Sequence, residues 1–156
     1  MRRFLCGLAS WFFAVPVSLW AWWQSRKILR GGRGLTLPEL ADARAVGVRQ
    51  PERIRVLAVR RVPNPLRLLA APIARFTRYQ VFDPAGMTLG FGIFARSELE
   101  GDRLLLAHEF VHVAQYERFG GVLGFMRRYI FQCLADGYLE AALEVEAREL
   151  SERTCS

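Results

Sequence analysis

Histidine, lysine and cysteine are scarce in this chain of 156 residues, and their scarcity excludes several classes of protein. The three cysteines, Cys6, Cys133 and Cys155, form no CxxC pair, which argues against a disulfide framework and against a thiolate zinc site. Lys27 is the only lysine, so the net charge of +7 comes almost entirely from arginine. No compact run of basic and aromatic residues resembles a nucleic-acid-binding signature, and we expect no nucleic-acid partner.

Apolar residues make up 52 % of the chain and are concentrated near its N-terminus. Residues 4–23, FLCGLASWFFAVPVSLWAWW, carry no charge and have the length that crosses a bilayer as a helix. Trp20, Trp22 and Trp23 lie at the end of this stretch, where amphipathic rings prefer the headgroup region. A cleaved signal peptide and a soluble or interfacial helix are the alternatives, but the bulky WAWWQ stretch is a poor cleavage site. The sequence therefore predicts a retained transmembrane anchor.

The basic residues around this stretch predict how the protein is placed in the membrane. Two arginines precede it and four basic residues follow it, between Arg26 and Arg33, so the positive-inside rule favours the following side as cytoplasmic. We expect a single-pass protein of a bacterial inner membrane with its folded part on the cytoplasmic side. The predicted division is a transmembrane anchor (residues 1–25), a basic, glycine-rich juxtamembrane linker (residues 26–35) and one folded domain (residues 36–156).

The sequence of residues 36–156 predicts a helix, then strands, then further helices. Thr36 followed by Glu39 has the pattern of a capping box, and runs of branched residues between turn signals predict strands. The predicted segments are a helix over 36–47, a strand over 53–61, a short helix over 66–76, a strand over 87–95, and helices from residue 104 onward that are interrupted at Gly120, Gly121 and Gly137. This order predicts the α+β class, with a small sheet beside a helical half.

The segment LLLAHEFVHVAQYERFG contains the only two histidines of the chain, His108 and His112, with Glu109 directly after the first. Residues four apart on a helix share a face, so both imidazoles can bind one Zn²⁺ and leave coordination positions open. Glu109 lies about 100° around the helix, where it can accept a proton from metal-activated water and later protonate the leaving amine. Two randomly placed histidines would show this pattern about once in a thousand chains of this length. The pattern predicts a zinc site with Glu109 as general base.

The residues alone leave the third protein ligand of the zinc open. There is no third histidine, so the HExxHxxGxxH pattern is excluded. Cys133 is possible, although nothing in its local sequence supports it. The segment LEAALEVEARE offers carboxylates at Glu140, Glu144, Glu146 and Glu149, and composition does not choose among them.

HEFVHVAQYERFG with the downstream EVEA resembles the gluzincin-type, zincin-like metallopeptidases, and is similar to their short bacterial membrane-anchored members over roughly residues 85–150. In that family a glutamate on a later helix, in a short E-x-x-A pattern, completes a His-His-Glu zinc site. The resemblance implies Glu144 as the third ligand, with Ala147 as the small residue after it and Glu146 as the fallback. Gln115 matches the glutamine after the second histidine, and we expect it to be structural.

Two further features are expected to face the substrate. In zincins the strand before the zinc helix commonly runs beside the substrate, which corresponds here to residues 87–95. The oxyanion of the reaction also needs a hydrogen-bond donor besides the metal. Tyr138, six residues before Glu144, is the candidate, ahead of Tyr116 and Tyr129.

The sequence thus predicts a zinc metalloprotease, a hydrolase that cleaves a protein or peptide substrate close to the lipid bilayer in which it is anchored. The expected fold is α+β, an N-terminal transmembrane helix followed by a small zincin-like domain whose helical C-terminal half carries the metal site. The alternatives are a non-catalytic scaffold that keeps the zincin fold and a metal-binding regulatory protein at the membrane. The intact Glu109 favours the enzyme, because a scaffold has no need of the base.

Overall fold

Helices form most of the structure, a computed structural model that describes residues 2–64 and 83–156 and, for residues 2–6, 8 and 9, the backbone alone. The described residues comprise five α-helices, one short 3-10 helix and a three-stranded sheet. In chain order these elements are α1 (Arg2–Gly31), α2 (Leu37–Ala45), η1 (Pro51–Arg53), β1 (Arg55–Val59), β2 (Gly86–Leu89), β3 (Gly92–Arg96), α4 (Arg103–Arg118), α5 (Val122–Asp136) and α6 (Ala142–Cys155).

The sheet has the strand order β1-β3-β2, with β1 parallel and β2 antiparallel to the central strand β3. The predicted helix over 36–47 and strand over 53–61 are confirmed as α2 and β1. The prediction of a single strand over 87–95 is wrong, because the chain reverses at Gly90, whose φ of +68° is accessible to glycine at little cost. The predicted helix over 66–76 lies outside the described residues.

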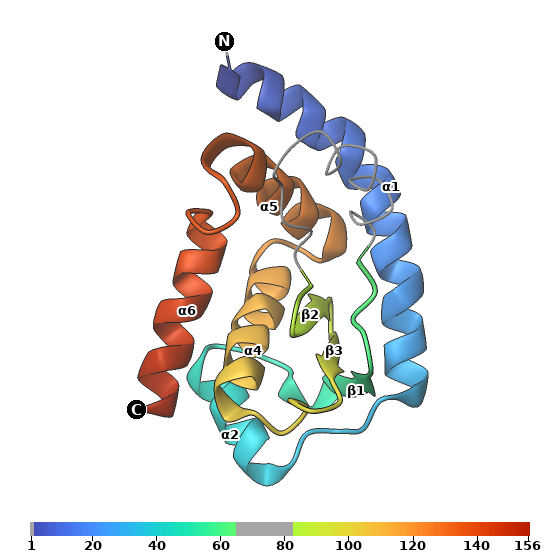
Figure 1. The fold of residues 1–156 in the computed structure, drawn as a ribbon, viewed down its shortest axis with the longest axis vertical. Coiled ribbons are helices and arrows are strands. Elements are labelled where there is room, and N and C mark those ends of the chain that lie inside the picture. Colours follow the sequence, from blue (N-terminus) through green and yellow to red (C-terminus); the bar gives the residue numbers. More distant parts are fainter. Residues whose placement is uncertain (1, 65–82) are drawn as a thin grey trace.

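Helices cover both faces of the sheet, with α1 on one side and α4 on the other (Figure 1). Side chains of β3 alternate between two apolar cores, as the pleat of a strand requires. Phe94 packs in the core that includes Ile28 of α1, whereas Ile93 and Ala95 pack in the core that includes Phe110 of α4. Helix α6 lies alongside α4 on the side away from the sheet (Figure 1).

The ends of the C-terminal helices follow from local chemistry. The carboxylate of Asp102 accepts a hydrogen bond of 2.7 Å from the backbone N–H of Leu105 and caps the start of α4. Gly120, Gly121 and Gly137, all with positive φ, separate α4 from α5 and end α5, which confirms the predicted interruptions. The break at Gly137 lets the chain turn back so that α6 packs on α4.

The predicted transmembrane helix is wrong, and the predicted fold class is wrong with it. Within residues 2–64 and 83–156, no helix is both long and apolar enough to cross a membrane. Helix α1 runs without a break from Arg2 to Gly31, through the segments expected to be anchor and linker, and packs on the sheet and on α5. Ile28 is fully buried there, over Gly92 of β3. The prediction rested on the length of the segment and its lack of charge, and neither property identifies the elements that pack against the helix.

We predict that Gly92→Ala destabilises the protein, because a Cβ atom at position 92 would lie 2.9 Å from the Cβ of Ile28. Overpacking of this kind costs about 1–3 kcal/mol of the free energy of unfolding. Urea denaturation followed by circular dichroism measures the loss. Gly101→Ala is the matched control, since a Cβ atom there meets nothing within 4 Å. Equal stability of the two variants would show that α1 does not pack on β3 in this way.

Candidate metal centre

Helix α4 places His108 and His112 on one face, four residues apart, as the sequence predicts. Their rings meet edge to face, and their Nε2 atoms lie 3.2 Å apart. The side chain of His112 is 9 % exposed, whereas that of His108 is 21 % exposed. The pair is therefore more accessible to solvent from the side of His108.

Helix α6 brings a carboxylate to the two histidines. Glu144 Oε2 lies 3.5 Å from His108 Nε2, and Glu144 Oε1 lies 3.5 Å from His112 Nε2. One ligand atom from each of the three residues lies within 4.8 Å of those of the other two. Ala147, fully buried in the core that α4 and α6 share, is small enough to let the two helices approach closely. We call His108, His112 and Glu144 the His-His-Glu cluster; they are the three residues predicted as metal ligands.

The His-His-Glu cluster has the spacing and the chemistry to hold one metal ion. Ligand atoms placed about 2.0–2.1 Å from a tetrahedral ion lie about 3.3 Å from one another. The separations of 3.2 Å and 3.5 Å in the cluster are close to this value. Two imidazole nitrogens and one carboxylate oxygen are also the ligand set of many catalytic zinc sites, in which the fourth position is left for water or substrate.

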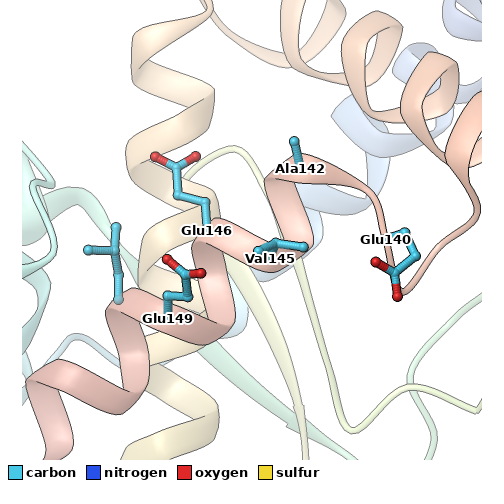
Figure 2. A pocket seen from close by; sticks show the side chains of 6 residues that line it. Glu140, Ala142, Val145, Glu146 and Glu149 are labelled. Atoms are coloured by element: carbon cyan, nitrogen blue, oxygen red, sulfur yellow. The ribbon is translucent and has the colours of Figure 1, made fainter.

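The other carboxylates considered as ligands have different partners or positions. Glu146 binds Arg118 through two contacts of 2.7 Å, one to each carboxylate oxygen. It also lines a hollow of about 480 Å³ on α6, together with Glu140 and Glu149 (Figure 2). Neither histidine lines this hollow. The structure therefore selects Glu144, and not the fallback Glu146, as the carboxylate beside the histidines.

Gln115 connects His112 on α4 to the start of helix α6. Its Oε1 lies 2.8 Å from His112 Nδ1, and its Nε2 donates to the backbone carbonyl of Leu143 and to Glu146. Because the amide oxygen can only accept, Nδ1 of His112 carries the proton and the lone pair of Nε2 points into the cluster. Gln115 thus fixes the orientation of the His112 ring, and the structural role expected for it stays a prediction.

The three tyrosines considered as oxyanion donors have different contacts in the structure. Tyr129 donates a hydrogen bond of 2.7 Å to Oε1 of Glu144, and Phe125 stacks on its ring. Burial and the charges of Glu144 and Glu109 raise the pKa of Tyr138, which shows that Tyr138 also lies near the cluster. Tyr116 is buried and donates to the backbone carbonyl of Thr88. Sequence reasoning ranked Tyr129 behind Tyr138 because the contact to Glu144 joins α5 to α6 and has no signature in the spacing.

Glu109 is nearly buried between α4 and β2 at 4 % exposure. The hydroxyl of Thr88 lies 2.7 Å from Oε2 of Glu109 and 3.0 Å from its backbone oxygen. Oε1 lies over Gly86, where an added Cβ atom would come within 2.5 Å of it. Thr88 and Gly86 thus fix one carboxylate oxygen and leave room for the other. Sequence reasoning missed both residues, because only the packing of β2 on α4 brings them to Glu109.

His108 and Glu144 each shift the pKa of the other toward its charged form. Burial alone would lower the pKa of His108, but its hydrogen bond to Glu144 and the charges of Glu109 and Glu144 raise the pKa above its ordinary value. Burial alone would raise the pKa of Glu144, but His108 and His112 hold it lower. Burial and the charge of Glu144 raise the pKa of Cys133 to about 12, so its thiol stays protonated and is a poor ligand at neutral pH.

Comparisons with protein-family models, with curated proteins and with solved structures found no match to this chain. The function of the His-His-Glu cluster is therefore inferred from the residues that form and surround it.

We predict that Glu144→Gln lowers the affinity for Zn²⁺ by at least about a hundredfold, since it replaces the charged ligand with a neutral amide. Glu146→Gln is the matched control on the same helix, and its loss should stay below about tenfold because Glu146 only supports Gln115. Competition with a chromophoric chelator measures both affinities in the full chain. If the two variants bind Zn²⁺ equally well, Glu144 is not the third ligand.

Proposed function

We propose that this protein is a zinc-dependent metallopeptidase of the gluzincin type. The observation that carries the proposal is the His-His-Glu cluster with Glu109 fixed beside it on the same helix. If the cluster had only a structural role, three ionisable side chains would be buried together, and their desolvation would cost free energy. A bound divalent cation explains why these three side chains converge. Metal binding alone does not require Glu109, so its presence beside the cluster favours catalysis.

His108, His112 and Glu144 would hold the zinc. Zinc held by two imidazoles and a carboxylate acidifies water and polarises a carbonyl oxygen, and this is the chemistry that it would supply here. Gln115 orients His112, and Tyr129 orients Glu144 through their direct hydrogen bonds. Such supporting contacts restrict the ligands to the geometry that the metal needs.

Glu109 is the proposed general base. Thr88 anchors Oε2, which leaves Oε1 to accept a proton from the water that adds to the peptide carbonyl carbon. The same carboxyl then delivers this proton to the amide nitrogen as the C–N bond breaks, so the amine leaves in neutral form. Glu109 returns to its carboxylate form, ready for a second cycle.

Tyr138 remains the proposed donor to the oxyanion. The carboxylate of Glu144 interacts with the hydroxyls of both Tyr129 and Tyr138, so both tyrosines lie at the cluster. The raised pKa of Tyr138, caused first by burial and then by the charge of Glu144, keeps its hydroxyl protonated and able to donate.

The proposed substrate is a protein or peptide in extended conformation. Strand β2 is the outer strand of the described sheet on the side of Glu109, and it contributes Gly86 and Thr88 to the surroundings of that residue. This position suits a peptide that runs beside β2, with backbone hydrogen bonds as in strand addition. The corresponding expectation for residues 87–95 is therefore narrowed to the strand Gly86–Leu89.

We predict that Glu109→Gln abolishes peptide cleavage while zinc binding is retained. The amide keeps the shape and the contact to Thr88 but cannot accept the proton, which should lower kcat at least about a hundredfold. Cleavage of fluorescently labelled casein and metal analysis of the same sample provide the two readouts. Glu140→Gln is the control, since Glu140 lies in the hollow of Figure 2, outside the cluster.

The outcomes of this experiment separate the candidate functions. Absence of stoichiometric zinc in the wild-type protein would overturn the metalloenzyme. Zinc binding without cleavage by wild type or variant would favour a non-catalytic scaffold or a metal-binding regulatory protein.

We further predict that Gly86→Ala lowers kcat by about ten- to a hundredfold with little effect on zinc affinity. The added methyl group would displace Oε1 of Glu109, which moves the base without touching a ligand. Gly101→Ala, with no neighbour within 4 Å, is again the control. Unchanged kcat in Gly86→Ala would show that Oε1 does not act in the reaction.

A further inference from the structure

Helix α1 presents large apolar side chains to solvent along most of its length. At 100° per residue these side chains, with the exception of Phe13, fall within an arc of about 120°. They also continue over more than three turns of the helix. We call this surface the outer face of α1; its residues are Trp11, Phe12, Val15, Leu19, Trp22 and Trp23.

The opposite face of α1, which packs on the rest of the protein, carries smaller and more polar side chains. Ser10, Ala14, Ala21, Gln24 and Ser25 are all buried there. Burial of large apolar groups stabilises a fold more than burial of alanine and serine. The most apolar side of α1 is therefore the side that the fold leaves uncovered among the described residues, which is the reverse of an ordinary surface helix.

Helix α1 lies lengthwise on the rest of the domain, so its outer face points away from the domain along the whole helix. Near its C-terminal end the helix lies on the sheet through Ile28 and Gly92. The N-terminal half of α1 lies along α5, and there the guanidinium of Arg127 stacks over the ring of Trp11. The helix is thus held lengthwise (Figure 1), and its outer face forms one continuous strip.

The charges that α1 itself carries next to this strip are all positive, although Asp136 and Glu140 line a hollow with Trp11 near its N-terminal end. Arg26 continues the outer face and stacks over the ring of Trp22, and Arg30 follows one turn later; both are exposed. The sequence contains no acidic residue before Glu39. A partner that fits this surface must therefore be apolar, tolerant of tryptophan rings at its boundary, and negatively charged at its rim.

We propose that the outer face of α1 binds the surface of a bilayer that contains anionic phospholipids, with the helix lying in the plane of the membrane. Aromatic and apolar side chains would enter the headgroup boundary, and Arg26 and Arg30 would contact lipid phosphates. A second copy packed helix against helix fits less well, because its α1 would bring the same cations and no carboxylate of its own. The domain, packed along the other side of α1, stays outside the bilayer.

The chain supplies its own probe of this contact, since all four tryptophans lie in α1. Addition of phosphatidylcholine vesicles that contain phosphatidylglycerol should shift tryptophan emission to the blue and carry the full chain into the vesicle fraction. Vesicles of phosphatidylcholine alone should bind more weakly. Lipids brominated near the headgroup should quench the emission more than lipids brominated near the chain end, because the helix lies flat at the boundary.

Phe12→Ser with Leu19→Ser tests the surface itself. These side chains are 81 % and 66 % exposed, so the change removes little from the folded core. The matched control is Leu37→Ser with Leu139→Ser, at 82 % and 64 % exposure, at two positions outside helix α1. The α1 variant should lose about tenfold or more in vesicle affinity, and the control should keep the wild-type value.

A second pair tests the charge. Arg26→Gln with Arg30→Gln should reduce the preference for anionic over neutral vesicles. Arg44→Gln with Arg49→Gln is the control for net charge, since it removes the same two charges outside α1.

Three results would overturn the proposal. The first is equal vesicle affinity of the Phe12/Leu19 variant and its control. The second is stronger quenching from the bilayer interior than from the headgroup region, which would mean that the helix crosses the bilayer. The third is a protein dimer that forms without lipid and is lost in the Phe12/Leu19 variant, which would assign the outer face to a second copy.

Discussion

The arrangement of the site depends on one buried carboxylate, Glu144, held between two histidines and a tyrosine. Removing a carboxylate from water costs several kcal/mol unless charges and hydrogen bonds replace the lost hydration. His108, His112 and Tyr129 supply these contacts, and they come from two other helices. Helices α4, α5 and α6 are therefore fixed relative to one another by the same group that completes the candidate metal site. Packing of Ala147 in the shared core is what lets Glu144 reach the histidines.

Different residues support the His-His-Glu cluster and Glu109. Gln115 links His112 to the backbone of α6, so that the ligands on two helices move together. Thr88 and Gly86 act on Glu109 instead, from the sheet. The proposed metal ligands and the proposed base are thus supported by different elements, α5 and α6 for the ligands and β2 for the base. This separation is what allows a substitution to affect the base and leave the ligands in place.

Helix α1 shows how one segment can satisfy two requirements. Small and polar side chains form much of the face that packs on α5 and the sheet, together with Ile28, which packs over Gly92. Most of its large apolar side chains are left outside. Residues 4–23 are apolar, as the prediction of a transmembrane helix requires. What α1 contacts, however, depends on which side of the helix carries the large apolar side chains, and not on the length of the segment. A mean hydropathy does not contain that distribution.

Local periodicity was enough to place His108, Glu109 and His112, because positions one and four residues apart on a helix have a fixed relation. Capping residues and glycines likewise located α2, β1 and the ends of α4 and α5. The residues alone did not separate Glu144 from Glu146, and only the tertiary structure placed one in the cluster and the other on Arg118. Thr88, Gly86 and the contact of Tyr129 to Glu144 were found only in the structure, since each acts across two different elements of the fold. The sequence by itself determined which groups could carry the chemistry. The tertiary structure decided which carboxylate joins them and which side of α1 stays uncovered, because both depend on contacts between helices that no local pattern encodes.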